Sequence, residues 1–220
     1  MRRTYIDFVR NSLEKIQAGE PIYTKQLAKQ LAESFHLDEK AAAAATAVAF
    51  KRIMDTHIVA GLRFYQKGIY YKTPETPLGE VGINKEQLIA DKYILPHIGY
   101  ETGHTALYRL GLTAQMPRER LIATNIAKNC ARTDKRLGVT IRPPKVTVTA
   151  ENKAYLQVLD VLDLLDKVPV DEEQPYAIIS DHIQNKHLQY NELLAIADSY
   201  YNQNTVLQLA RTASLGGISV

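Results

Sequence analysis

The chain has 220 residues, is 45% hydrophobic and 23% charged, and carries a formal charge of +3, which is the composition of a soluble protein with one large or two small domains. Its single cysteine, Cys130, excludes an internal disulfide and a multi-cysteine metal site. The longest apolar run, residues 41–50, is about half of a membrane span, and the first residues lack the apolar core of a signal peptide. We therefore expect a cytoplasmic protein without membrane association.

The charges are unevenly distributed along the chain. Residues 1–74 contain 12 Lys and Arg against 7 Asp and Glu, and residues 118–145 contain 8 against 2. Residues 150–220 are acidic, with 4 basic side chains against 10 acidic ones. This asymmetry favours two basic surfaces for a polyanion, with ordinary solvated faces as the alternative.

The first 72 residues predict three helices and a hairpin. The first helix is amphipathic, with apolar residues at Ile6, Val9, Leu13 and Ile16. Thr24 would be the N-cap of a short second helix, and Asp38 that of a third helix reaching about His57. The apolar period then becomes two, and Gln66-Lys67-Gly68 predicts the turn of a hairpin.

Three helices followed by a basic hairpin are typical of a winged helix-turn-helix, which we assign to residues 1–76. The second helix would brace the DNA backbone and the third would enter the major groove. The third helix is nearly all alanine at its front, so only two of its side chains there, Lys40 and Thr46, would reach bases. Binding of a protein instead of DNA is the alternative. The predicted DNA-binding residues are Thr24, Lys25, Lys40, Thr46, Lys51, Arg52, Arg63 and Lys67.

A second domain is predicted over residues 77–220, after a Pro-, Thr- and Gly-rich linker at residues 72–82. Thr102 or Gly103 would open a short helix that Gly111 closes. Strands are expected at "LIATNIA" and, as two short strands, in "GVTIRPPKVTVT". Leucines at helical spacing and Asp, Asn and Gln breakers predict a helical C-terminal half. The predicted fold class is therefore α+β.

Residues that suggest chemistry do not form a catalytic or metal pattern. Glu101, His104 and Arg109 have no serine or cysteine nucleophile nearby, and His104 and Arg109 share a helix face poorly. Three acids on one predicted helix lack histidine support, so a solvated face is favoured; they are Asp160, Asp163 and Asp166. His182 and His187 are expected to be surface or core residues. We predict no enzymatic activity, no metal and no cofactor.

The segment "QKGIYYK", the stretch "GYETGHTALYRLGLTAQMP" and the following "LIATN" resemble the AbiEi-type antitoxins of bacterial type IV toxin–antitoxin (abortive infection) systems, in their winged-helix branch. The resemblance covers about residues 5–201. It implies a DNA-binding antitoxin that represses its own operon and counteracts a nucleotidyltransferase-like toxin without a stable complex. The alanine-rich third helix departs from the polar one that the family implies.

The second basic segment could add contacts to the same duplex, on which a homodimer is one expected arrangement. Lys128 and Arg132 could instead pair with acids of the C-terminal third. Three other functions stay open: a nuclease targeted by the winged helix, a ligand-responsive regulator without a toxin partner, and a protein-interaction scaffold. The candidate second DNA contacts are Arg118, Arg120, Lys135, Arg136 and Arg142.

Overall fold

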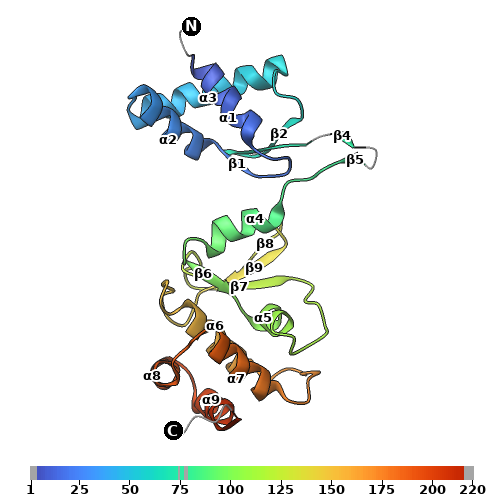
Figure 1. Cartoon of the computed structure of the whole chain (residues 1–220), viewed down its shortest axis with the longest axis vertical. Coiled ribbons are helices and arrows are strands. Elements are labelled where there is room, and N and C mark those ends of the chain that lie inside the picture. Colours follow the sequence, from blue (N-terminus) through green and yellow to red (C-terminus); the bar gives the residue numbers. More distant parts are fainter. Residues whose placement is uncertain (1–3, 74, 77–78, 216–220) are drawn as a thin grey trace. The chain divides into compact units, whose positions relative to one another are not determined.

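The computed structural model describes residues 4–73, 75–76 and 79–215 (Figure 1). It divides into two compact units, unit 1 (Met1–Leu88) and unit 2 (Ile89–Val220), and each is treated by itself. Both contain helices and a small sheet, so the predicted α+β class is confirmed. Among the described residues, no helix has both the length and the apolar character needed to cross a membrane.

Unit 1 groups three helices with a three-stranded antiparallel sheet of order β1-β3-β2. Asp38 is the N-cap of the third helix, as predicted, and its carboxylate accepts the Ala41 N–H at 2.8 Å. The hairpin also forms at the predicted place, with Gly68 at a φ of +82° in its turn. The elements are α1 (Tyr5–Lys15), β1 (Ile22–Tyr23), α2 (Thr24–Phe35), α3 (Glu39–Thr56), β2 (Leu62–Gln66) and β3 (Ile69–Lys72).

The core of unit 1 joins one stripe from each helix to the sheet. Val9 and Leu13 of α1 are fully buried, four residues apart, as the apolar spacing predicts. Phe50 of α3 is also buried, and its ring packs on the ring of Tyr70 from β3 with centroids 4.6 Å apart. The helices thus cover one side of the sheet and leave the outer face of α3 to solvent (Figure 1).

The described residues of the predicted linker form two short strands that belong to unit 1. β4 (Glu75–Thr76) and β5 (Gly79–Glu80) pair as an antiparallel ribbon, while residues 74, 77 and 78 lie outside the described residues. The Asn84 N–H donates to Gly19 C=O at 2.8 Å, which ties the following segment back to unit 1. The compact unit therefore ends at Leu88, within α4 (Lys85–Ile89), beyond the boundary at residues 76 and 77 that composition suggested.

Unit 2 contains a four-stranded mixed sheet of order β6-β7-β9-β8, in which β7 and β9 are parallel. One face, with Ile122, Val139 and Ile141, packs on Tyr93 of the π-helical turn η1 (Ala90–Ile94). The predicted short helix is α5 (Gly103–Arg109), and Gly111 follows its end with a φ of +74°. The strands are β6 (Gly99–Glu101), β7 (Arg120–Thr124), β8 (Arg132–Asp134) and β9 (Val139–Arg142).

One strand prediction in unit 2 is wrong. The segment "GVTIRPPKVTVT" forms a single strand, β9, because the chain leaves the sheet at Pro143 and Pro144, which cannot donate ladder hydrogen bonds. Val148 instead packs beside Tyr100 and Leu156 on the other face of the sheet. The Asn125 side chain holds this extended segment through two hydrogen bonds to the Val148 backbone, at 2.8 and 2.9 Å.

The C-terminal half of unit 2 is helical, as the leucine spacing predicts. Leu156, Leu159 and Leu162 of the first of these helices are fully buried. In Figure 1 the four helices, coloured orange to red, gather on one side of the sheet. They are α6 (Lys153–Leu164), α7 (Pro175–Asn185), α8 (Tyr190–Tyr200) and α9 (Gln203–Leu215).

A buried carboxylate connects these helices to the sheet. Asp160 of α6, whose side chain is only 2% exposed, accepts hydrogen bonds from Tyr100 at 3.0 Å and from Thr102 at 2.6 Å. Tyr201, directly after α8, donates to the other carboxylate oxygen, Oδ1, at 2.9 Å. The Arg142 guanidinium forms an ion pair with Oδ2, the oxygen that Tyr100 and Thr102 share. Burial, together with the nearby carboxylate, raises the pKa of both phenols, so their hydroxyls stay protonated as donors. Asp160 is therefore part of the core of unit 2 and does not lie on a solvated face.

Replacing Asp160 by Asn should lower the free energy of unfolding of unit 2 by roughly 2–4 kcal/mol, because Arg142 loses its counter-charge and the donors lose an acceptor. We expect a value near the lower end of this range, because the Arg142 side chain is 27% exposed and water partly compensates its lost counter-charge. Urea denaturation followed by near-UV circular dichroism measures this change. Asp198→Asn, at an exposed position of α8, is the control and should change the stability by less than about 0.5 kcal/mol.

Candidate functional site

The start of α2 and the β2–β3 turn are joined by hydrogen bonds. The Thr24 N–H donates to Gly68 C=O at 3.0 Å, and the Thr24 hydroxyl reaches the same oxygen at 3.3 Å. Thr24 is thus the first residue of α2, with Tyr23 at the N-cap, and its hydroxyl is directed at the turn; the predicted capping role is wrong. Lys25 follows Thr24 and Lys67 precedes Gly68, the two residues that this hydrogen bond joins, and both lysines are exposed. Two predicted phosphate-binding lysines therefore lie at one edge of unit 1.

The outer face of α3 presents lysines at both ends of a small apolar stripe. Lys40 is exposed in the first turn, and Lys51 and Arg52 are exposed three turns later. Between them the exposed positions are Ala43, Ala44, Ala47 and Val48. The face thus offers charge at its ends and close approach in its middle.

Thr46 does not belong to this face. It is 1% exposed, and its hydroxyl has no hydrogen-bond partner among the described atoms. Ala42, Ala49 and Phe50 are buried on the same side of α3. The prediction that Thr46 reaches bases is therefore wrong, because the helix packs on α1 and α2 through the side that carries it.

Two neighbouring side chains of β2, Arg63 and Phe64, differ in their interactions with the rest of unit 1. The Arg63 guanidinium lies 2.7 Å from the Glu80 carboxylate, so part of its charge is neutralised within unit 1. Phe64 is 57% exposed, although the period-two pattern places it on the same face as the buried Leu62. Val48 and Phe64 are the exposed apolar side chains near the basic residues that sequence reasoning missed. Burial on the edge strand β2 depends on tertiary packing, so period-two alternation did not distinguish Phe64 from the buried Leu62.

The second basic segment, residues 118–145, separates into paired and unpaired cations. Arg120 is bonded to Glu101, with its Nε 3.0 Å from the carboxylate, and Arg142 is paired with Asp160. These two predicted DNA contacts are instead internal ion pairs of unit 2. The remaining three candidates are exposed: Arg118, Lys135 and Arg136.

The alternative that Lys128 and Arg132 pair with acids of the C-terminal third is not found among the described residues. Both are exposed, and neither forms a salt bridge within the part of the chain that the structure describes. Arg132, Lys135 and Arg136 instead line a cavity of about 460 Å³ together with Lys92 of η1. Unit 2 thus gathers four cations around one hollow.

Asp134 is the acid of this cavity. Partial burial acts to raise its pKa, but hydrogen bonds from Lys92, Tyr93 and the Leu137 N–H outweigh burial and hold the pKa at about 2. Its Oδ2 accepts from Lys92 Nζ and from the Tyr93 hydroxyl, both at 2.8 Å. Asp134 is therefore ionised at neutral pH and fixed in place.

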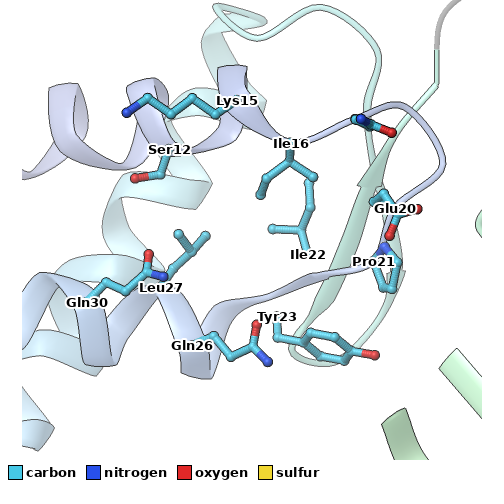
Figure 2. A pocket seen from close by; sticks show the side chains of 11 residues that line it. Ser12, Lys15, Ile16, Glu20, Pro21, Ile22, Tyr23, Gln26, Leu27 and Gln30 are labelled. Atoms are coloured by element: carbon cyan, nitrogen blue, oxygen red, sulfur yellow. The ribbon is translucent and has the colours of Figure 1, made fainter. Parts of the chain in front are cut away.

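Unit 1 has a cavity of its own, of about 540 Å³, between α1, β1 and α2 (Figure 2). Ile16 and Ile22 lie at its centre, with Lys15 on the α1 side and Gln26 and Gln30 on the α2 side. Glu20 is the one acid of the described lining. This lining combines amides with aliphatic side chains and joins no nucleophile to a base.

Two of the three residues around α5 that were considered for catalysis, Glu101 and Arg109, belong to an ion cluster. The Glu101 carboxylate, 14% exposed, lies between Arg120 and Arg109, whose Nε is 3.2 Å away. His104 is exposed and forms no hydrogen bond with the described side chains of this cluster. Within the described ranges, no group of three or more His, Cys, Asp or Glu side chains is placed to hold a metal ion.

Comparison with known proteins gives little. No family model and no curated protein matches the chain. Among solved structures, the RV2827C protein from Mycobacterium tuberculosis aligns with a TM-score of 0.47 and 12% sequence identity, over 97% of this chain and 78% of that one. At this identity and TM-score, the likeness carries no argument about this chain.

Replacing Thr46 by Val should raise the free energy of unfolding of unit 1 by up to about 1 kcal/mol, because it removes a buried unpaired hydroxyl and keeps the side-chain shape. The predicted affinity for promoter DNA should stay within about twofold, since the side chain is inside the core. Thermal denaturation and a DNA titration measure the two effects. If a stable variant bound DNA much more weakly, the prediction that Thr46 contacts DNA would be restored.

Proposed function

We propose that unit 1 is a winged helix that binds duplex DNA, with α3 in the major groove and the β2–β3 turn as its wing. One observation supports this most: the order α1-β1-α2-α3-β2-β3, closed by a β1-β3-β2 sheet, brings α2, α3 and the turn together around exposed lysines. The N-terminus of a helix and nearby lysines suit DNA phosphates. Lys25 and Lys67 would hold one stretch of backbone, and α3 would approach the bases.

The surface of α3 favours affinity over base selection. Lys40 and Lys51 are eleven positions apart, about 16 Å along a helix, so they would meet phosphates near the two edges of a groove. Ala43, Ala47 and Val48 between them offer methyl groups, which can contact thymine methyls but form no hydrogen bonds. We therefore expect steep salt dependence and modest discrimination between sequences.

Replacing Lys40 and Lys51 together by Ala should weaken binding to the chain's own promoter fragment. The slope of log affinity against log salt should fall by up to about 0.9 per lost phosphate contact. Fluorescence anisotropy at several salt concentrations measures both values. Lys40 and Lys51 lie on the same face of α3, and neither forms a salt bridge with an acid in the described chain.

The matched control is Lys15→Ala with Lys186→Ala. It removes the same charge from exposed positions on α1 and at the end of α7, outside the proposed surface. Its slope should change by less than about 0.5. Equal losses in both double variants would assign DNA affinity to overall charge and reject the α3 surface.

We further propose a role for the whole chain: an antitoxin that represses its own operon in the bacterial cytoplasm and counteracts a nucleotidyltransferase-like toxin. The support is the resemblance of residues 99–117 and their neighbours to AbiEi-type antitoxins, together with the two-unit organisation. In this proposal unit 1 carries repression and unit 2 carries toxin neutralisation. The cationic cavity of unit 2 favours one alternative, a ligand-responsive regulator without a toxin partner.

The two roles should separate by mutation. The Lys40→Ala, Lys51→Ala chain should lose repression of a promoter reporter, yet still restore growth when it is co-expressed with a nucleotidyltransferase-like toxin encoded beside it. The reason is that both lysines belong to unit 1, so replacing them leaves unit 2 unchanged. The wild-type chain must do both. If it represses the reporter but never restores growth, the regulator is favoured over the antitoxin.

A further inference from the structure

We infer that the cavity between η1 and the β8–β9 hairpin of unit 2 binds a small ligand that carries two or three phosphate groups. This site is separate from the DNA surface proposed for unit 1, and the inference does not depend on it. It rests on how the strand register, one partly buried acid and a tight turn place four cations around a single hollow.

The strand register directs the charged side chains of β8 toward η1. Arg132 is directly opposite Ile141, and Asp134 is directly opposite Val139, in the antiparallel β8–β9 pair. Side chains of directly paired residues lie on the same face of a sheet. Ile141 and Val139 pack on the face that Tyr93 covers, so Arg132 and Asp134 emerge there too. Lys92 reaches the same place from η1.

Asp134 organises the cavity and does not neutralise it. Its Oδ2 is taken by Lys92 and Tyr93, and its Oδ1 accepts the N–H groups of Arg136 and Leu137 at 3.2 and 3.3 Å. All its bonds therefore fix the wall of the cavity and the turn that carries the basic residues. Lys135 and Arg136 are held at the rim by a rigid turn, which favours ligand binding because little order is lost.

Three of the four cations have no counter-charge in the described chain. Arg132, Lys135 and Arg136 are exposed and form no salt bridge there, whereas Lys92 forms a salt bridge with Asp134. Four positive groups and one carboxylate leave the site with a net charge of about +3, the charge that two or three phosphate groups balance. Two arginines can also bind phosphate oxygens in a bidentate manner.

The shape of the site favours a small ligand over a duplex. A volume of about 460 Å³ falls in the usual range of small-molecule sites, about 300–1,000 Å³. Tyr93 and Ile141, both almost fully buried, form a floor below the cations. A duplex presents its phosphates along an extended line, which a ridge or a helix surface follows better than a hollow does.

The test is calorimetric titration of the full chain with inorganic tripolyphosphate and with orthophosphate at about 0.15 M ionic strength. Tripolyphosphate should bind at least about tenfold more tightly than orthophosphate, because it reaches several cations at once. Lys135→Gln with Arg136→Gln should weaken tripolyphosphate binding at least about tenfold. Both positions are exposed, and an unchanged melting temperature of the free variant confirms that it is folded.

Two controls make the result specific. Arg118→Gln with Lys128→Gln removes the same charges from exposed positions of the same basic segment outside the cavity lining, and should leave affinity within about twofold. The Lys40→Ala, Lys51→Ala chain should bind tripolyphosphate normally, so a failure of DNA binding does not affect this test. The inference is overturned if tripolyphosphate fails to bind, if both glutamine pairs weaken binding equally, or if promoter duplex displaces tripolyphosphate from the Lys40→Ala, Lys51→Ala chain.

Discussion

The buried carboxylate of Asp160 is the interaction on which the organisation of unit 2 depends. It joins β6 through Tyr100, β9 through Arg142 and the end of α8 through Tyr201 to a single residue of α6. A charge placed in the interior must be paired and hydrogen-bonded, and here four donors meet that requirement. This arrangement explains why a helix rich in leucine carries an aspartate on its buried side.

The same principle divides the basic segment that follows α5. Arg120 and Arg142 form ion pairs with the half-buried Glu101 and the buried Asp160. The first pair joins two neighbouring strands, β6 and β7, and the second joins β9 to α6. Asp134, by contrast, is saturated by hydrogen bonds from its own surroundings and leaves Arg132 and Arg136 free of ion pairs in the described chain. The basic segment thus contains cations with two different physical roles: some pair with internal acids, and others charge the surface.

Unit 1 depends on a simpler constraint, the bond between the start of α2 and the β2–β3 turn. Because Gly68 accepts the Thr24 N–H, the turn cannot move away from α2, and Lys25 and Lys67 stay at one edge. The proposed DNA surface would therefore combine a fixed phosphate clamp with a smooth α3 face. Such a surface suits strong binding that is sensitive to salt, while the cavity proposed in unit 2 would let a phosphorylated ligand act on the same chain.

The sequence by itself determined the features that arise from neighbouring residues. Apolar spacing located α1, α2 and α6, the Asp38 cap began α3, and Gly68 and Gly111 marked a turn and a helix end. Only the tertiary structure decided what each polar side chain faces: Thr46 and Asp160 became core residues, Arg120 and Arg142 became internal partners, and Arg132 joined a cavity. The physical reason is that caps and periodicity act over one or two turns of chain. Burial and ion pairing are set by strand register and by contacts between residues far apart in sequence, as between Asp134 and Lys92.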